Sequence, residues 1–508
     1  MTETMVNQLY YGDNLEVLRR YIRDESVDLC YIDPPFNSKR NYNQIYNNVG
    51  SEDKAQAQAF IDTWEWDDHA IHGLDEILTN YHGLFTQQCI ALIAGLSNVL
   101  GKGSLLAYLV SMTLRITEIH RVLKPTGSFY LHCDPTASHY LKLILDAVFS
   151  SQGGEFQNEI IWCYSIGGKS KKRFARKHDV ILFYTKSSKD IHTFNHKGAS
   201  IARKPNSHMK VGTDEDGRQY QEKKDKKTGK IYRYYLDQGK IAEDYWTDIE
   251  TLNREEKERL GYPTQKPEAL LERIIKASSN ENDIVLDAYC GCGTTVVVCQ
   301  KLERQWIGID ITYQSISLVL KRLEDSFGKE VLETIKLHGI PKDIESATAL
   351  ANKADDRTRK EFEKWAILTY TNNRAVINAK KGADKGVDGI VYFQGDKNEP
   401  EKVIFQVKSG KVKSGDIRDL LGTMTIENAS IAIFITLENP TKEMLKTAKS
   451  AGFYQSKYMS HSCDKIQIVT VEDIIENKQK LNIRLSYEVV KSAEKQKEVK
   501  VNQIELDI

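Results

Sequence analysis

One segment constrains the fold of this chain more than any other. The apolar residues 284–286 lead into a glycine turn over residues 287–295, and three valines follow at 296–298. This order predicts a β-strand, a tight turn and an α-helix, because glycine adopts the backbone angles that a sharp turn requires. The N–H groups at the start of such a helix can approach an anion closely. The segment therefore predicts an α/β fold with a ligand site at the turn.

Two further acidic residues follow predicted strands in the same way. Asp310 ends the apolar run 306–309, nineteen positions after Gly291, and an acid at about this distance from a glycine turn commonly holds ribose hydroxyl groups. Asp13 ends another short apolar run near the start of the chain and could reach the edge of an adenine. Together the glycine turn and these acids favour a cofactor that contains a nucleoside.

A different kind of turn follows the strand-like run 27–32. It consists of Asp33, Pro34, Pro35 and Phe36. Each proline fixes φ and removes a backbone donor, so the carbonyl groups of Asp33 and Pro34 face a cleft without competing N–H groups. Two acceptors on the protons of an exocyclic amine would help to localise its lone pair toward an electrophile. Phe36 could stack on the base, so the turn predicts chemistry on a nucleobase amine.

Three motifs, in their order along the chain, resemble the β-class amino-methyltransferases that use S-adenosylmethionine (SAM) on DNA. They are the Asp33 to Phe36 turn, the segment 264–271 with Lys266 and Pro267, and the glycine turn. In that family the catalytic half precedes the cofactor-binding half, a circular permutation of the usual methyltransferase order. Protein-glutamine and many RNA methyltransferases place a similar turn after the glycine loop and fit less well. The resemblance covers roughly residues 5–330 and implies a Rossmann-like SAM methyltransferase with permuted motif order and an inserted target-recognition region.

The resemblance also implies roles for individual residues. Asp33, with Pro34 and Pro35, would hold the target amine, and Phe36 would hold the flipped base. The implied cofactor-binding residues are Asp287, Gly291 and Gly293 with Thr294 for the methionine part of SAM, Asp310 for the ribose, Asp13 for the adenine, and Lys266 and Pro267 beside the methionine carboxylate. Cysteines at 290 and 292 depart from the small residues that relatives often carry there. Because no second cysteine pair lies nearby, we expect them to be small core residues and not zinc ligands.

Charge is distributed unevenly along a chain that carries 71 basic and 71 acidic residues. Residues 165–240 contain twenty Lys or Arg and eight Asp or Glu. A local basic excess in a neutral protein is typical of a nucleic-acid contact. The resemblance implies that this partner is double-stranded DNA. The candidate DNA-binding residues are Lys171, Lys172, Arg173, Arg176 and Lys177, with Lys169 beside them. A solvated lysine-rich loop is the alternative interpretation.

Residues 187–250 are the candidate target-recognition region, because the family places recognition between the catalytic turn and the Lys266 motif. Aromatic residues there could pack or stack among the basic ones. They are Tyr220, Tyr232, Tyr234, Tyr235 and Trp246. Residues 91–123 form a long helix-like stretch that we interpret as scaffold around the catalytic cleft.

The chain changes character after about residue 340. The predicted organisation is a methyltransferase domain (1–340), a polar linker (341–359), a second α/β domain (360–487) and a charged tail (488–508). The second domain resembles the Mrr-like branch of the PD-(D/E)xK restriction endonucleases, in which Gln replaces the second acid. By position, Asp388 and Glu363 would bind Mg²⁺ with the Val407 carbonyl, while Gln406 would support the site and Lys408 would orient the attacking water. The alternative is a DNA-binding module that does not cleave.

Composition places the protein in a broad class. At about 100–200 residues for each domain, 508 residues allow about three. Eight scattered cysteines without a C-x-x-C pair argue against a disulfide scaffold. The first residues lack a signal-peptide layout, and no uncharged apolar run approaches the roughly 18 residues that span a bilayer. We therefore expect a cytoplasmic protein without membrane contact, and the sequence leaves open whether it forms a homo-oligomer.

The combined hypothesis is a SAM-dependent DNA methyltransferase fused to a Mg²⁺-dependent endonuclease, as in restriction and modification. Adenine is the expected target, because aspartate at position 33 is the usual form in adenine enzymes of the family and serine is frequent in cytosine enzymes. The mechanism would be base flipping followed by direct methyl transfer to the exocyclic nitrogen. A cytosine-N4 methyltransferase is the alternative.

Overall fold

The protein is described by a computed structural model. Its described residues are 6–35, 40–46, 55–62, 64, 66–165, 171–172, 174–203, 208–253, 256, 258–260, 262, 264–352, 356–371, 375–377, 386–396, 399–455 and 462–483. Three residues of the predicted sites, Phe36, Lys169 and Arg173, lie outside these ranges, as does the charged tail. Within the described residues no helix is long and apolar enough to cross a membrane.

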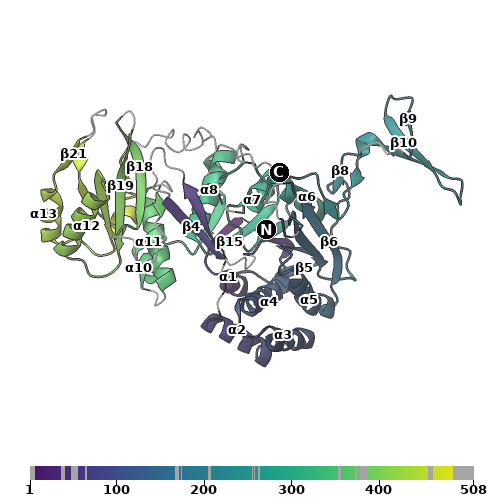
Figure 1. Ribbon diagram of the computed structural model, residues 1–508, viewed down its shortest axis with the longest axis horizontal. Helices are drawn as coiled ribbons and strands as arrows, with labels where there is room; N and C mark the ends of the chain where they lie inside the picture. Colours follow the sequence, from purple (N-terminus) through teal and green to yellow (C-terminus); the bar gives the residue numbers. More distant parts are fainter. Residues whose placement is uncertain are drawn as a thin grey trace, which may run out of the picture.

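A nine-stranded sheet is the centre of the larger, N-terminal part of the molecule (Figure 1). Its strands, in spatial order, are β13 (Tyr245–Trp246), β6 (Glu155–Cys163), β7 (His178–Thr185), β5 (Leu123–Cys133), β2 (Val27–Ile32), β14 (Ile284–Asp287), β15 (Gln305–Asp310), β1 (Asn7–Tyr11) and β16 (Ile335–His338). Strand β7 runs antiparallel to both of its neighbours, and the other described pairs are parallel. Strands β2 and β14 are adjacent although about 250 residues separate them, so the two predicted motifs meet.

Helices cover both faces of this sheet. One face packs against α1 (Asn14–Tyr21), α2 (Asp68–Thr79), α3 (Gln87–Leu100), α4 (Ser104–Val122) and α5 (Ser138–Val148). The other packs against α6 (Glu268–Ser278), α7 (Thr294–Lys301), α8 (Tyr313–Phe327) and the short α9 (Glu330–Glu333). Side chains alternate across each strand, so Leu9 lies in one apolar core and Tyr10 in the other. Both faces are therefore buried, as parallel strands require.

Two expectations about helices need correction. The single long stretch expected over residues 91–123 is two helices, α3 and α4, because Gly101 ends α3 with a positive φ of 67°. The segment expected to be a linker contains α10 (Ile344–Ala351), which begins with a capping box at Asp343 and Ser346. Its small apolar residues Ala347 and Ala351 are buried. Short side chains gave this helix a weak apolar period in the sequence.

Several small sheets lie outside the large sheet. Strands β9 (Lys210–Thr213), β10 (Gln219–Lys224) and β11 (Ile231–Tyr235) form an antiparallel sheet, and β8 (Ser200–Ile201) pairs with β12 (Lys240–Ile241). We call residues 208–238 the recognition arm, since they lie in the candidate recognition region. Figure 1 shows this arm projecting away from the large sheet. A separate hairpin consists of β3 (Arg40–Tyr46) and β4 (Ala55–Asp62), and short 3-10 helices span Ser150–Gln152 and Leu236–Gln238.

The C-terminal region is a second α/β unit. Its five-stranded sheet has the order β17 (Val376–Ile377), β18 (Gly389–Asp396), β19 (Glu399–Lys408), β20 (Ile431–Thr436) and β23 (Ile466–Thr470). One face packs against α12 (Ser414–Ile426) and α13 (Lys442–Ser450), and the other against α11 (Asp356–Tyr370) and α14 (Val471–Ile475). Strands β21 (Phe453–Gln455) and β22 (Ser462–Asp464) form a short hairpin. This region therefore has the α/β character expected for residues 360–487.

Candidate active site

The carboxyl ends of four parallel strands bring the predicted acids together. Strand β14 lies between β2 and β15, and β15 pairs with β1. Asp33 follows β2, Asp287 ends β14, Asp310 ends β15 and Asp13 follows β1. Ligands of open α/β sheets bind at this edge. The structure thus gathers at one site residues that lie in distant parts of the sequence.

Asp287 holds the glycine turn from inside. Its carboxylate is buried and accepts hydrogen bonds from the Tyr289 backbone N–H at 3.0 Å and the Thr295 hydroxyl at 2.6 Å. Gly293 has a φ of +76°, and a Cβ there would lie 2.8 Å from Val319 Cγ2. Both the backbone angle and the close packing therefore require glycine at 293. The turn is a rigid cradle that opens at the start of α7.

Asp310 joins this turn to the neighbouring strand ends. The Gly291 N–H donates to one carboxylate oxygen at 3.0 Å, and the Thr312 N–H donates to the other at 2.9 Å. The Gly12 N–H donates to the Asp310 backbone carbonyl at 2.9 Å. Asp310 therefore positions the glycine turn, the start of α8 and the end of β1 together.

Asp13 occupies the rim of the same site. One carboxylate oxygen caps α1 by accepting from the Leu15 N–H at 2.9 Å, and the other pairs with Arg115 at 2.9 Å. Arg115 also donates to the Asn14 side chain, which in turn donates to the Ala288 carbonyl at 2.8 Å. Arg115 and Asn14 were not predicted from the sequence. Asn14 could have been identified from the sequence, because it directly follows Asp13.

The carboxyl groups of Asp287 and Asp310 both have raised pKa values. Burial raises the pKa of Asp287 to about 7, and the nearby charges of Asp33 and Asp310 add to that shift. Burial also raises the pKa of Asp310 to about 6. Burial without a ligand favours the neutral acid at both positions, and a cation in the cleft would favour the carboxylates. The residues thus fit a positively charged cofactor such as SAM.

Lys266 links the two predicted motifs directly. Its ammonium group lies 2.6 Å from Asp33 Oδ2 and is almost fully buried. Its backbone carbonyl accepts from the Thr294 hydroxyl at the start of α7. Pro267 is the N-cap of α6. The ion pair with Asp33 was not predicted, since the motif placed Lys266 only beside the methionine carboxylate.

A buried polar chain lies behind the catalytic turn and was not predicted from the sequence. The Tyr31 hydroxyl contacts His132 Nδ1 at 2.9 Å, and His132 Nε2 contacts Asp179 at 3.1 Å. The Tyr164 hydroxyl donates to the other oxygen of Asp179 at 3.2 Å. Burial alone would raise the pKa of Asp179, but the hydrogen bond and charge of His132 hold it below its ordinary value. The chain ties the end of β2, just before Asp33, to β5, β6 and β7.

The predicted nuclease residues do not assemble a metal centre. One oxygen of Asp388 accepts the Val407 N–H at 2.7 Å, and the Lys408 ammonium lies 4.0 Å from Asp416. The side-chain oxygen of Gln406 is buried without a hydrogen-bond donor among the described residues. In the part of the chain that the structure describes, no three His, Cys, Asp or Glu residues, Glu363 included, form a group that could hold a metal. The described part of the chain therefore gives no support to the expected Mg²⁺ site.

Comparison with known proteins decides the family. A profile described as DNA methylase matches residues 27–321, more than half of the chain. The chain belongs to this DNA methylase family. A second profile, described as NACHT-associated inactive restriction endonuclease 1, matches residues 359–476.

Two relatives and one solved structure are similar to this DNA methylase. The type II methyltransferase M.HpaI of Haemophilus parainfluenzae is 33% identical over 213 residues, which cover 42% of this chain and 58% of the relative. The DNA adenine methyltransferase YhdJ of Escherichia coli K12 is 28% identical over 331 residues, which cover 65% and 87%. The solved M1.HpyAVI–SAM complex is 18% identical with a TM-score of 0.33, over 62% of this chain and 98% of that one. The alignment with M.HpaI therefore spans little more than half of the length of that relative.

We call the candidate DNA-binding residues between 171 and 177 the basic segment, and its described residues lie at or near the surface of the methylase. Lys171, Lys172 and Arg176 are exposed, whereas the Lys177 ammonium donates to the Ser165 carbonyl. The aromatic residues of the recognition arm stack on arginines: Arg233 lies over Tyr220 at 4.4 Å and Arg218 over Tyr235 at 4.2 Å. Each of these arginines also pairs with an acid. Such pairs stiffen a small sheet that has little apolar core.

Two details of the recognition region differ from expectation. Trp246 lies in β13, the edge strand of the large sheet that pairs with β6, and it is buried, so of the two expected roles it packs in the core. The hairpin between β10 and β11 carries five lysines of the basic excess that were not among the named candidate residues: Lys223, Lys224, Lys226, Lys227 and Lys230. Asp225 holds this tip by accepting from the N–H groups of Lys227 at 2.9 Å and Thr228 at 2.7 Å. The arm thus ends in a basic tip whose turn is held by Asp225.

Proposed function

We propose that this methylase transfers a methyl group from SAM to the exocyclic amine of adenine in double-stranded DNA. The observation that carries the proposal is the placement of the Asp33-Pro34 turn beside the acids and the glycine turn of the proposed cofactor cradle, within one DNA methylase fold. The E. coli relative that aligns over 331 residues is named a DNA adenine methyltransferase, which supports adenine over cytosine.

The residues of the cleft would divide the work. SAM supplies an electrophilic methyl group on a positively charged sulfur. Asp287 and Asp310 would become ionised as they bind the cation, and the glycine turn would hold its methionine part. Lys266 neutralises Asp33 and orients its carboxylate, which leaves Oδ1 without a donor among the described residues. That oxygen and the Pro34 carbonyl would accept the amine protons and align the nitrogen with the methyl group.

Base identity has a direct test. Methylated DNA is digested to nucleosides, and N6-methyladenosine and N4-methylcytidine, both in their deoxy form, are separated by mass. The adenine assignment expects the first product. The second product would replace it with the cytosine-N4 alternative and leave the methylase assignment intact. Long-read sequencing of DNA from cells that express the chain would then reveal the recognition sequence.

SAM binding should release protons near pH 6 to 7. The pKa values of Asp287 and Asp310, about 7 and 6, lie in this window in the free protein, and a bound cation would lower both. Below these pKa values a proton must leave as SAM binds, so affinity should rise with pH by up to about tenfold per unit for each group. Calorimetry at pH 6 in buffers of different ionisation enthalpy measures the release. Equal enthalpies in all buffers would contradict it.

Two basic elements should bind DNA phosphates. Replacing Lys226 and Lys227 of the arm tip, or Lys171 and Lys172 of the basic segment, with Gln should weaken DNA binding and reduce its dependence on salt. The slope of log affinity against log salt should fall by about 0.9 for each phosphate that a lysine no longer neutralises. Lys329→Gln is the matched control, since this lysine is also highly exposed but lies after α8. If a double replacement leaves the slope of log affinity against log salt unchanged, the element that carries it is a solvated surface and not a DNA contact.

For the C-terminal domain we propose a non-cleaving module. Two observations favour this alternative: the profile match to an inactive restriction endonuclease, and the lack, among the described residues, of three His, Cys, Asp or Glu side chains grouped so that they could hold a metal. The intact chain should therefore leave methylated and unmethylated duplexes uncut with Mg²⁺ or Mn²⁺. If it cuts either duplex, and Asp388→Ala and Lys408→Ala both abolish the cutting, the endonuclease hypothesis from the sequence is restored.

A further inference from the structure

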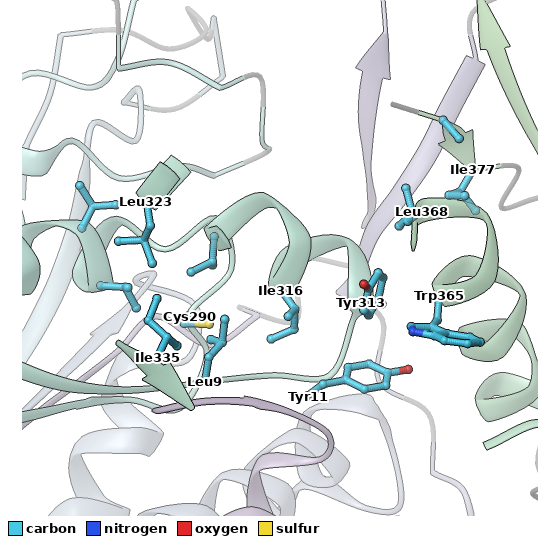
Figure 2. Packing of buried hydrophobic residues seen from close by; sticks show 14 of the residues in the cluster. Leu9, Tyr11, Cys290, Tyr313, Ile316, Leu323, Ile335, Trp365, Leu368 and Ile377 are labelled. Atoms are coloured by element: carbon cyan, nitrogen blue, oxygen red, sulfur yellow. The ribbon is translucent and has the colours of Figure 1, made fainter. Parts of the chain in front are cut away.

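The C-terminal domain is joined to the methylase fold through a buried seam. Helix α11 packs beside the start of α8, and Figure 2 shows Trp365 and Leu368 of α11 close to Tyr11 and Tyr313 of the methylase. All four side chains are buried. The Tyr313 hydroxyl also contacts the Thr369 hydroxyl at 3.1 Å. The two folds thus share one apolar core.

A single carboxylate crosses this seam. Glu361 of α11 is 7% exposed, and its Oε2 accepts from the Tyr11 hydroxyl at 3.2 Å and from the Tyr313 backbone N–H at 3.1 Å. Its other oxygen pairs with Lys364 at 2.5 Å on the same helix. A buried carboxylate needs such partners, because an unpaired one would be strongly disfavoured. Glu361 is therefore fixed in place by groups on both sides of the seam.

Both methylase partners of Glu361 adjoin the candidate cofactor site. Tyr11 ends β1, two residues before Asp13, and the next residue donates its N–H to the Asp310 carbonyl. Tyr313 begins α8, three residues after Asp310, and Thr312 between them donates to the Asp310 carboxylate. The Tyr313 N–H is one of the donors at the start of a helix that have no partner within the helix, and Glu361 satisfies it. One side chain therefore holds both segments that flank the acids of the site.

We infer that Glu361 is a positioning residue for the cofactor site, so that SAM binding by the methylase depends on its docked C-terminal domain. Without Glu361, the Tyr313 N–H and the Tyr11 hydroxyl would be buried without this acceptor. The end of β1 and the start of α8 would then shift to reach water or another partner. Because Asp13 and Asp310 are attached to these segments, their spacing would loosen. The inference rests on the proposed use of SAM.

The test compares full-length variants by SAM calorimetry and steady-state kinetics. Glu361→Ala should raise the SAM Kd and KM about tenfold, while kcat at saturating SAM and DNA affinity stay close to wild type. Glu361→Gln, which keeps an acceptor oxygen, should recover much of the affinity. Thr369→Val is the matched control, because it removes a seam hydrogen bond of the same helix without touching a backbone group beside the acids. It should lower Tm without changing SAM affinity.

The outcomes separate this inference from the proposed function. A wild-type chain that binds no SAM refutes the proposed function together with the inference. Wild-type binding with unchanged affinity in Glu361→Ala refutes the inference alone, and so does an equal loss in Thr369→Val, which would indicate general weakening of the seam. If Glu361→Ala does not fold, Tyr11→Phe removes one of the two donors and keeps the ring. It should weaken SAM binding in the same direction, and unchanged affinity would again overturn the inference.

Discussion

Replacing Asp33 with alanine should lower the rate of methyl transfer by about 10²–10⁴-fold and leave SAM affinity nearly unchanged. The carboxylate that this variant removes is proposed to accept a proton of the target amine, an interaction that matters most while the new bond forms. Asp33 pairs with Lys266, and among the described residues no hydrogen bond joins it to the glycine turn. Single-turnover kinetics with saturating DNA measures the first effect, and calorimetry measures the second.

Asp28 offers a matched control on the same strand. It also pairs with a lysine, Lys124, at 2.8 Å, and its side chain is similarly buried, but it lies at the amino end of β2. Asp28→Asn should leave methyl transfer within a few-fold of wild type. A collapse of SAM affinity in Asp33→Ala would contradict the assignment, because the residue would then belong to the cofactor site and not to the target amine.

Replacing Asp310 with alanine should produce the opposite pattern, with SAM binding weakened by about 1.5–3 kcal/mol, which is roughly 10- to 150-fold. The variant removes the proposed hydrogen bonds to the ribose. In addition, the N–H groups of Gly291 and Thr312 lose their shared acceptor, so the glycine turn is no longer held against α8. The effect should therefore fall toward the upper end of this range.

Asp310→Asn separates the two contributions. Its amide oxygen can still accept from one of the two N–H groups, so the turn should stay closer to its native position and the loss of SAM affinity should be smaller. At saturating SAM both variants should approach the wild-type rate. An unchanged Kd in Asp310→Ala would remove Asp310 from the cofactor site.

Local patterns predicted the strands and the helix that carry the main motifs. The apolar run 27–32 is β2, and the strand, glycine turn and helix expected at 284–298 are β14 and α7. The wrong predictions have local causes as well. Gly101 divides a continuous apolar pattern into two helices. Helix α10 was not predicted, because its buried face contains alanines, whose short side chains give a weak hydrophobic pattern in the sequence. The domain boundaries stay predictions, and the two domains on either side of the expected linker 341–359 share one apolar core.

The sequence by itself determined the chemistry-bearing turns, because prolines and glycines restrict the backbone within a few residues and leave a pattern that can be recognised. Only the tertiary structure decided which groups meet. The pairing of Lys266 with Asp33 and the buried chain from Tyr31 to Tyr164 join residues from distant strands. Glu361 likewise reaches the segments beside the cofactor site from another domain. Such contacts depend on strand order and helix packing. These are set by the burial of apolar side chains over the whole chain, so no local sequence pattern can predict the contacts.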